Sequence, residues 1–282
     1  MILAEQYYYL IAGLPNIEPD TDMLPIDQTA FKDVLLEQCS LQEAALLNWL
    51  LYPLDNENLV RMLYHKAAMV ETGAFTSSAL DNIINKKVNP PHYMSTFLEA
   101  FWQDKEAHSE NEWKNKLTTL YYQATQTLGN AFLRNWMEFE LKLKNLIVAI
   151  NGRKHNFLYT DALIPGGEFT IQLASGNKKT DFGLTDDELP VKDVIKMMDN
   201  PNLLIKEKYL DDLRWRWLDE HTFFHYFTIE TLLAYYVKLG ILSRWHKLDS
   251  RWGREHLHKM LKGFSQNLTF PKDVVKLSAQ KN

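Results

Sequence analysis

The sequence contains little cysteine, glycine or proline, and each shortage excludes something. Cys39 is its single cysteine, which excludes an internal disulfide framework and any metal site built from cysteines alone. Only 11 glycines and 10 prolines occur among 282 residues, whereas turn-rich all-β domains usually need more of both. Uncharged apolar runs of about 18 residues are also missing, so no membrane span is predicted. These shortages favour a helical chain, and we expect it to be cytoplasmic.

The spacing of the glycines excludes the usual phosphate-binding loops. No two glycines are separated by two or by five positions. The sequence therefore contains neither the Gly-x-Gly-x-x-Gly motif of dinucleotide-binding domains nor the Gly-x-x-x-x-Gly-Lys motif of a P-loop. Residues 176–180 resemble the end of a P-loop but lack its glycine frame. A Gly-x-Ser-x-Gly nucleophile elbow is also missing. We therefore expect no nucleotide, no other cofactor and no catalytic residue.

Signals for the start of a helix are frequent. Ser40 is followed three residues later by Glu43, and Ser109 by Glu112, which is the spacing of a capping box. The second box precedes a long proline-free stretch whose apolar residues recur every three to four positions. We therefore predict one very long helix over residues 112–151.

The remaining pattern is also mostly helical. A second proline-free stretch predicts another very long helix over residues 203–245, and residues 185–198 predict a shorter one. Only residues 7–12 and 169–173 resemble strands, and both are short. The predicted fold class is all-α, an elongated array of helical bundles with two very long helices and minor short strands. The predicted bundles are residues 1–108, 109–184 and 185–282.

A faint internal repeat connects two of these bundles. Asn58 begins the pattern Asn-Leu-(Val/Ile)-x-x-(Leu/Ile)-x-x-(Lys/Arg), and Asn145 begins it again 87 residues later. Each copy is followed by a Gly-x-Phe-Thr tag, at residues 73–76 and 167–170. A buried asparagine can hydrogen-bond neighbouring backbone as both donor and acceptor. We therefore predict that the two asparagines form equivalent joints between helices. The apolar positions of the pattern also arise by chance, because helices commonly have this spacing.

Two kinds of chemistry remain open as alternatives. His221 and His225 are four residues apart and would share one face of the predicted helix, as metal ligands can, with His258 as a third candidate. The aromatic residues beside them indicate equally well that these histidines pack in a core or an interface. Residues 214–217, Arg-Trp-Arg-Trp, could stack on nucleic-acid bases, although four nearby acids could pair with the arginines instead. The alternatives are a helical metal-dependent enzyme and a helical RNA-binding protein.

The net charge of −5 is unevenly distributed. Residues 238–282 contain ten lysines or arginines and three acids, so the rest of the chain carries a net charge of −12. This basic end could be a solvated helix and tail, or a surface that docks phosphate, anionic lipid or an acidic protein. The candidate docking residues are Arg244, Arg251, Arg254, Lys259 and Lys262.

Short motifs resemble the C-type subunit of the rotary V/A-type ATPases, which the eukaryotic V-ATPase has as its d-type subunit. That family repeats Asp-x-x-Asn-Leu-x-x-x-Leu with a basic residue nearby, followed by a Pro-Gly-Gly turn. Residues 55–63, Asp-Asn-Glu-Asn-Leu-Val-Arg-Met-Leu, match the motif, and residues 164–167, Ile-Pro-Gly-Gly, follow its second copy. Lys142 replaces the aspartate in that copy, and the family's C-terminal pattern survives only over residues 233–238. The chain looks closest to a divergent bacterial branch of unknown function that is encoded beside V-type ATPase subunits.

The resemblance implies an all-helical, funnel-shaped coupling subunit built from three related bundles, with no metal and no enzymatic activity. Its implied partners are the central-shaft subunits, similar to D and F, and the membrane rotor ring, and nucleic acid is not among them. Its implied location is cytoplasmic, peripheral to the inner membrane as part of the ATPase complex. The candidate structural joints are Asp55, Asn58, Asn145, Gly166 and Gly167.

Overall fold

The computed structural model describes residues 7–19, 21, 24–66, 73–175, 179–185 and 189–248. Within these ranges every regular element is a helix, which confirms the all-α prediction there. Two single turns of 3-10 helix, η1 (Lys105–Ala107) and η2 (Thr160–Ala162), accompany the α-helices. The α-helices are α1 (Tyr8–Ala12), α2 (Gln28–Gln38), α3 (Leu41–Leu63), α4 (Ser77–Ile84), α5 (His92–Gln103), α6 (Glu110–Thr125), α7 (Ala131–His155), α8 (Gly167–Ala174), α9 (Val191–Met198), α10 (Leu203–Thr222) and α11 (Ile229–Leu248).

Both predicted strands are wrong, because each segment is helical. Residues 7–12 fall almost entirely in α1, and residues 169–173 lie inside α8. Aromatic and β-branched residues suggested strands there. In α8, however, the buried residues Thr170 and Leu173 are three apart, which is a helical period. Tertiary packing therefore overrides the local preference in these two segments.

The first very long helix is also wrong, since the chain turns at residues 126–130. Helix α6 ends at Thr125, and α7 starts after Asn130, whose side chain accepts a hydrogen bond from the Leu133 N–H at 2.9 Å. Asparagine is a strong N-cap because this bond satisfies an otherwise unpaired amide. The capping boxes predicted at Ser40 and Ser109 are both present. The sequence signal for the break was Asn130 after Gly129.

The second very long helix breaks in the same way. Helix α10 ends at Thr222 and α11 begins at Ile229, with a turn of mostly aromatic residues between them. The hydroxyl of Thr222 bonds back to the Leu218 carbonyl at 2.6 Å. The shorter helix predicted over residues 185–198 exists as α9, but begins later, at Val191. Each of the two predicted very long helices is therefore a hairpin of two helices, about half as long as expected.

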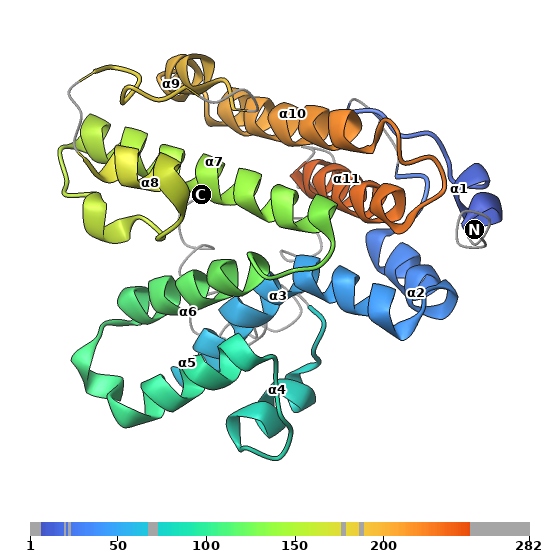
Figure 1. Ribbon diagram of the computed structural model, residues 1–282, viewed down its shortest axis with the longest axis horizontal. Coiled ribbons are helices and arrows are strands. Elements are labelled where there is room, and N and C mark those ends of the chain that lie inside the picture. The colour runs from blue at the N-terminus through green and yellow to red at the C-terminus, as the bar shows by residue number, and fades with distance from the viewer. Residues whose placement is uncertain are drawn as a thin grey trace, which may run out of the picture.

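Six helices in three successive pairs, α2–α3, α6–α7 and α10–α11, line one pocket, and we call them the six-helix ring. Helix α3 packs on α6, and α11 packs on both α2 and α3, as can be followed in Figure 1. Helices α7 and α10 meet through side chains, for example the stacked rings of Phe139 and Trp217, whose centroids are 5.5 Å apart. Outside this six-helix ring, α5 packs on α6 and α9 packs on α7 and α10. The proposed bundle boundaries after residues 108 and 184 stay predictions.

Aromatic side chains fill much of the space between the helices. Trp113 of α6 is fully buried against Phe97 and Phe101 of α5. Edge-to-face ring contacts of this kind add stability beyond burial alone. None of the described helices is both long enough and apolar enough to cross a lipid bilayer.

Candidate functional site: the centre of the helical ring

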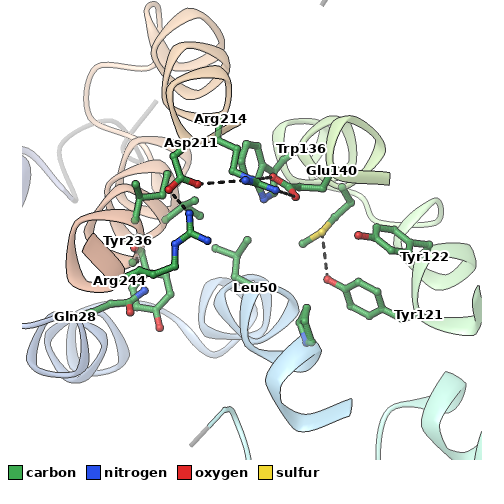
Figure 2. A pocket seen from close by; sticks show the side chains of 15 residues that line it. Gln28, Leu50, Tyr121, Tyr122, Trp136, Glu140, Asp211, Arg214, Tyr236 and Arg244 are labelled. Carbon is green, nitrogen blue, oxygen red and sulfur yellow. Dashed lines mark hydrogen bonds and ion pairs between the residues drawn. The ribbon is translucent and has the colours of Figure 1, made fainter. Parts of the chain in front are cut away.

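The six-helix ring forms a cavity of about 410 Å³ that is open to solvent, and every helix of the ring contributes to its wall (Figure 2). Apolar and aromatic side chains form most of this wall. The charged side chains gather where α7, α10 and α11 meet. The residues labelled in Figure 2 are Gln28, Leu50, Tyr121, Tyr122, Trp136, Glu140, Asp211, Arg214, Tyr236 and Arg244.

Arg214 connects two of the helix pairs across the cavity wall. Its Nε atom lies 2.7 Å from Glu140 Oε1 of α7, and its second terminal nitrogen lies 3.2 Å from Glu140 Oε2. The remaining terminal nitrogen donates to Asp211 Oδ1 at 3.2 Å. Burial alone would lower the pKa of the guanidinium, but the two carboxylates more than offset this and raise that pKa. Arg214 therefore stays charged and fixes α10 to α7.

Asp211 is the centre of the same network. Its side chain is almost completely buried and accepts hydrogen bonds from Arg214, from Arg244 and from the Trp245 indole, the last at 2.7 Å. Arg244 also contacts Glu207 at 3.2 Å. A carboxylate can be buried when both of its oxygens accept hydrogen bonds and its charge is paired, as here. We call Glu140, Asp211, Arg214, Arg244 and Trp245 the Asp211 network; it ties α7, α10 and α11 together.

Two tyrosines of α6 complete the opposite wall. The hydroxyl of Tyr121 donates to the Trp49 carbonyl oxygen at 2.7 Å and lies 3.2 Å from the Met137 sulfur. Burial raises the pKa of Tyr121 and of Tyr122 well above the ordinary value. Both phenols are therefore neutral hydrogen-bonding groups at physiological pH.

Away from the cavity, Asp55 joins α3 to the segment before α4. The side chain is fully buried, and its two oxygens accept hydrogen bonds from Ala74 N at 2.9 Å and from Phe75 N at 3.1 Å. A Cβ atom at Gly73 would lie 2.3 Å from Asp55 Oδ1. This close approach explains the glycine of the first tag. Asn58, one turn further along α3, is also fully buried.

Asn145 forms a comparable joint between α7 and the segment before α8. Its side-chain oxygen accepts from Ile164 N at 2.9 Å, and its amide donates to Ile164 O at 2.8 Å and to Thr170 Oγ1 at 3.0 Å. The residue is fully buried. One side chain thus satisfies both backbone groups of a buried residue, which is the use of asparagine that the sequence suggested.

The joints at Asp55 and Asn145 occupy equivalent positions along their helices. Asp55 and Asn145 are each the fifteenth residue of their helix, and each bonds to the residue 19 positions further on. Each joint is followed by an eight-residue helix, α4 or α8. Asp55 and Asn145 are therefore related by a shift of 90 residues, whereas the equivalence of Asn58 with Asn145, at a shift of 87 residues, stays a prediction. Ser243, which is also buried, is the fifteenth residue of α11.

Comparison with known families places the chain in a family without an assigned role. A family model named DUF2764, whose description reads protein of unknown function, matches residues 4–267. The chain belongs to the DUF2764 family. Neither the curated proteins nor the solved structures yield a match. The function of this chain therefore has to be inferred from its own residues.

The two glycines predicted to be joints occupy different surroundings in this DUF2764 protein. A Cβ atom at Gly166 would lie 2.6 Å from a methyl group of the buried Leu141, whereas a Cβ atom at Gly167 would meet nothing within 4 Å. We expect Gly166→Ala to lower the free energy of unfolding by about 1–3 kcal/mol, because Leu141 must move. Gly167→Ala should change it by less than about 0.5 kcal/mol. Urea denaturation of both variants checks this, and equal effects would contradict the steric account.

The buried carboxyl of Asp55 predicts a pH dependence of stability. Burial raises its pKa from 3.8 to about 6, against the opposing effects of the Ala74 and Phe75 amides and of the Lys32 charge. Because the folded-state pKa lies above the unfolded one, protonation favours the folded chain. The contribution of Asp55 is therefore complete below about pH 4 and is lost as the pH rises through about 6.

Asp55→Asn should remove this dependence, because an amide does not titrate. The variant should be less stable than the wild type by a larger margin at pH 4.5 than at pH 7.5. Urea unfolding curves at the two pH values measure this difference. A margin that is the same at both values, or larger at pH 7.5, would show that Asp55 does not have a raised pKa.

Of the predicted basic docking residues, the structure places only one. Arg244 is half exposed and already pairs with Asp211 and Glu207 of α10, so it holds the third helix pair together. The other four candidates lie outside the described residues: Arg251, Arg254, Lys259 and Lys262.

The predicted metal ligands are not brought together. His221 stacks on Trp217 with ring centroids 3.7 Å apart, and its Nδ1 lies 2.9 Å from the Trp217 carbonyl oxygen. Since α10 ends at Thr222, His225 lies in the turn and does not share a helix face with His221. Within the part of the chain that the structure describes, no three histidine, cysteine or acidic side chains are grouped so that they could hold a metal ion. His258 lies outside that part.

Both tryptophans of the Arg-Trp-Arg-Trp segment pack inward, whereas Arg216 is exposed. Trp215 and Trp217 are buried, so neither indole can stack on a nucleic-acid base. Arg214 pairs with Asp211, as the helical spacing suggested, but also with Glu140, 74 positions earlier in the chain. Sequence reasoning missed Glu140 because no local pattern connects it to Arg214.

Proposed function

We propose that this chain is a non-catalytic coupling subunit of a V/A-type rotary ATPase, located between the central shaft and the membrane rotor ring. The proposal begins with the sequence resemblance to the C-type subunit of these ATPases. The observation that carries it is the six-helix ring, in which three successive helix pairs all line the same open cavity. An adaptor between a shaft and a ring needs a body with an axial surface, and this arrangement offers one.

Torque transmission also requires a stiff body. Buried polar groups with directional hydrogen bonds fix the packing. Asp55 and Asn145 hold the segments before α4 and α8, and the Asp211 network ties α10 to α7 and α11. Fully satisfied buried networks of this kind fix one packing arrangement. The aromatic contacts between α5 and α6 and between α7 and α10 fill the remaining interfaces. These features suit a mechanical role.

The chemistry of the cavity agrees with a role that needs no reactive group. Arg214 pairs with Glu140 and Asp211, and Arg244 pairs with Asp211 and Glu207. The nearby Tyr121 and Tyr122 phenols are held neutral by burial, which raises their pKa. A cavity with paired charges and neutral phenols can accommodate part of a partner protein.

The finer features of the proposal follow from the resemblance. The three helix pairs would belong to three related bundles in a funnel-like array. Shaft subunits similar to D and F would dock at the cavity, and the rotor ring at another face. The chain would then be cytoplasmic and peripheral to the inner membrane through its partners.

Co-purification tests this proposal. A tag on this chain should retain the D-like and F-like shaft subunits and the rotor ring from gently solubilised membranes of its own organism. The Asp211→Ala variant should retain less of each, because the wall of the cavity loosens, whereas the exposed Asp219→Ala variant should retain the wild-type amount. Recovery of the intact ATPase without this chain, from cells that express it, would contradict the proposal.

A further inference from the structure

Helix α1 lies beside the turn between α10 and α11 at one end of the molecule (Figure 1), and both segments carry exposed aromatic side chains. Tyr9 and Phe224 have the largest exposed fractions, 87% and 80%. Large rings exposed together on a protein surface commonly mark an interaction site. We call this surface the aromatic end; it comprises Tyr8, Tyr9, Phe223, Phe224 and Tyr226.

The aromatic end is held together by ring contacts between two distant parts of the chain. Tyr8 of α1 and Phe227 of the turn have centroids 4.7 Å apart. Within each part, Tyr8 contacts Tyr9 at 5.5 Å and Phe223 contacts Phe224 at 4.9 Å. Rigid aromatic side chains lose little conformational entropy on binding, so they make good anchors.

Exposed carboxylates accompany these rings. Residues 217–237 include three acids and no lysine or arginine, and the described residues among 7–31 include Glu18 and Asp27 and again neither cation. Asp219 pairs with Lys238, but Glu220 and Glu18 lie on the exposed surface. An anionic lipid surface or a nucleic acid would be repelled by this end.

We propose that the aromatic end docks a segment of a partner protein that combines apolar side chains with lysines or arginines. Apolar side chains of that segment would cover the exposed rings. Its cations would approach the neighbouring carboxylates and the ring faces, which attract cations. This proposal does not depend on the ATPase assignment.

The opposite end of α10 provides a matched control surface. Leu203, Leu204 and Ile205 are exposed in the first turn of this helix, where Lys206 follows. A 20-residue helix is about 30 Å long, so the two surfaces are well separated. The control surface is similarly apolar but is accompanied by a cation, and so it lacks the proposed complementarity.

The experiment uses the full chain and two synthetic helical peptides of about 18 residues, long enough to form a helix on binding. One peptide combines leucine with lysine, and the other has the same leucines with glutamate. We expect the lysine peptide to bind the wild-type chain and the glutamate peptide not to bind. The triple variant Phe223→Ser, Phe224→Ser, Tyr226→Ser should weaken binding about tenfold or more, as removal of anchor residues does. The control variant Leu203→Ser, Leu204→Ser, Ile205→Ser should change it less than about twofold.

Fluorescence anisotropy of labelled peptides measures the affinities, and circular dichroism verifies the fold. If the triple variant does not fold, the single Phe224→Ser variant replaces it, with a loss of about threefold or more expected. Equal binding by wild type and aromatic variant, or equal binding of both peptides, would overturn the proposal. It would also be overturned if the aromatic end bound phosphatidylcholine or phosphatidylglycerol vesicles but no lysine peptide. Loss of a wild-type dimer in the triple variant would instead assign this end to a second copy of the chain.

Discussion

Asp211→Ala is expected to lower the free energy of unfolding by about 3 kcal/mol, one of the largest effects of any single substitution in this chain. The carboxylate is buried and accepts bonds from Arg214, Arg244 and Trp245. Alanine would leave the Trp245 N–H without its acceptor. It would also leave the partly buried Arg214 to rely on Glu140 alone within this network.

Urea denaturation monitored by tryptophan fluorescence measures this effect, since Trp245 belongs to the network itself. Asp219→Ala, on the same helix, is the matched control. Its carboxylate is 56% exposed and pairs with Lys238, so its loss should cost less than about 1 kcal/mol. Asp211→Asn should have an intermediate effect, because it keeps one acceptor and loses the charge. If Asp211→Ala and Asp219→Ala cost the same, the network does not hold the helix pairs together.

Asn145→Ala is expected to cost a similar amount, about 3 kcal/mol, for a different reason. The side chain satisfies Ile164 N–H and C=O at once, and also the hydroxyl of Thr170. These groups are buried, so water cannot replace the lost bonds without disturbing the packing of α8 on α7. The expected result is a lower urea midpoint with an unchanged slope.

The substitution Asn145→Asp tests the hydrogen-bond assignment further, because it replaces the amide with a titratable carboxyl group. Asn145→Asp should be at least as destabilising as Asn145→Ala at pH 7.5, because its charge would face the Ile164 carbonyl oxygen. It should recover part of the loss at pH 4.5, where the carboxyl is protonated. Glu138→Ala, on the same helix, removes a half-exposed carboxylate whose loss should cost less than about 1 kcal/mol. A stable Asn145→Asp variant at pH 7.5 would contradict the hydrogen-bond assignment.

Much of the fold was predictable from the sequence because its signals are local. The scarcity of glycine and proline indicated helix, and the boxes at Ser40 and Ser109 marked two helix starts that the structure confirms. The two overlong helices failed for a local reason as well. Proline-free apolar stretches hide a hairpin when the turn is built from Asn130, or from the aromatic residues after Thr222, without proline.

The candidate site was harder to predict, because it depends on long-range contacts. Asn145 could be singled out, since an asparagine in an apolar helical pattern needs buried partners. The Asn-Leu pattern paired it with Asn58, and that pairing stays a prediction; Asp55 makes the contact that matches it in position along the helix. Nothing in the local sequence connects Glu140 with Arg214, or Asp211 with Trp245, because these pairs are created by the ring of helices.

Reconstitution of ATP-driven ion transport tests the central claim most directly. The V/A-type ATPase of the same organism would be assembled in lipid vesicles with this chain, without it, and with the Asp211→Ala variant. We predict that ATP hydrolysis continues without the chain while ion transport is lost, and that adding the wild-type chain restores transport. Full ATP-driven transport in its absence, with no change on adding it, would contradict a coupling role.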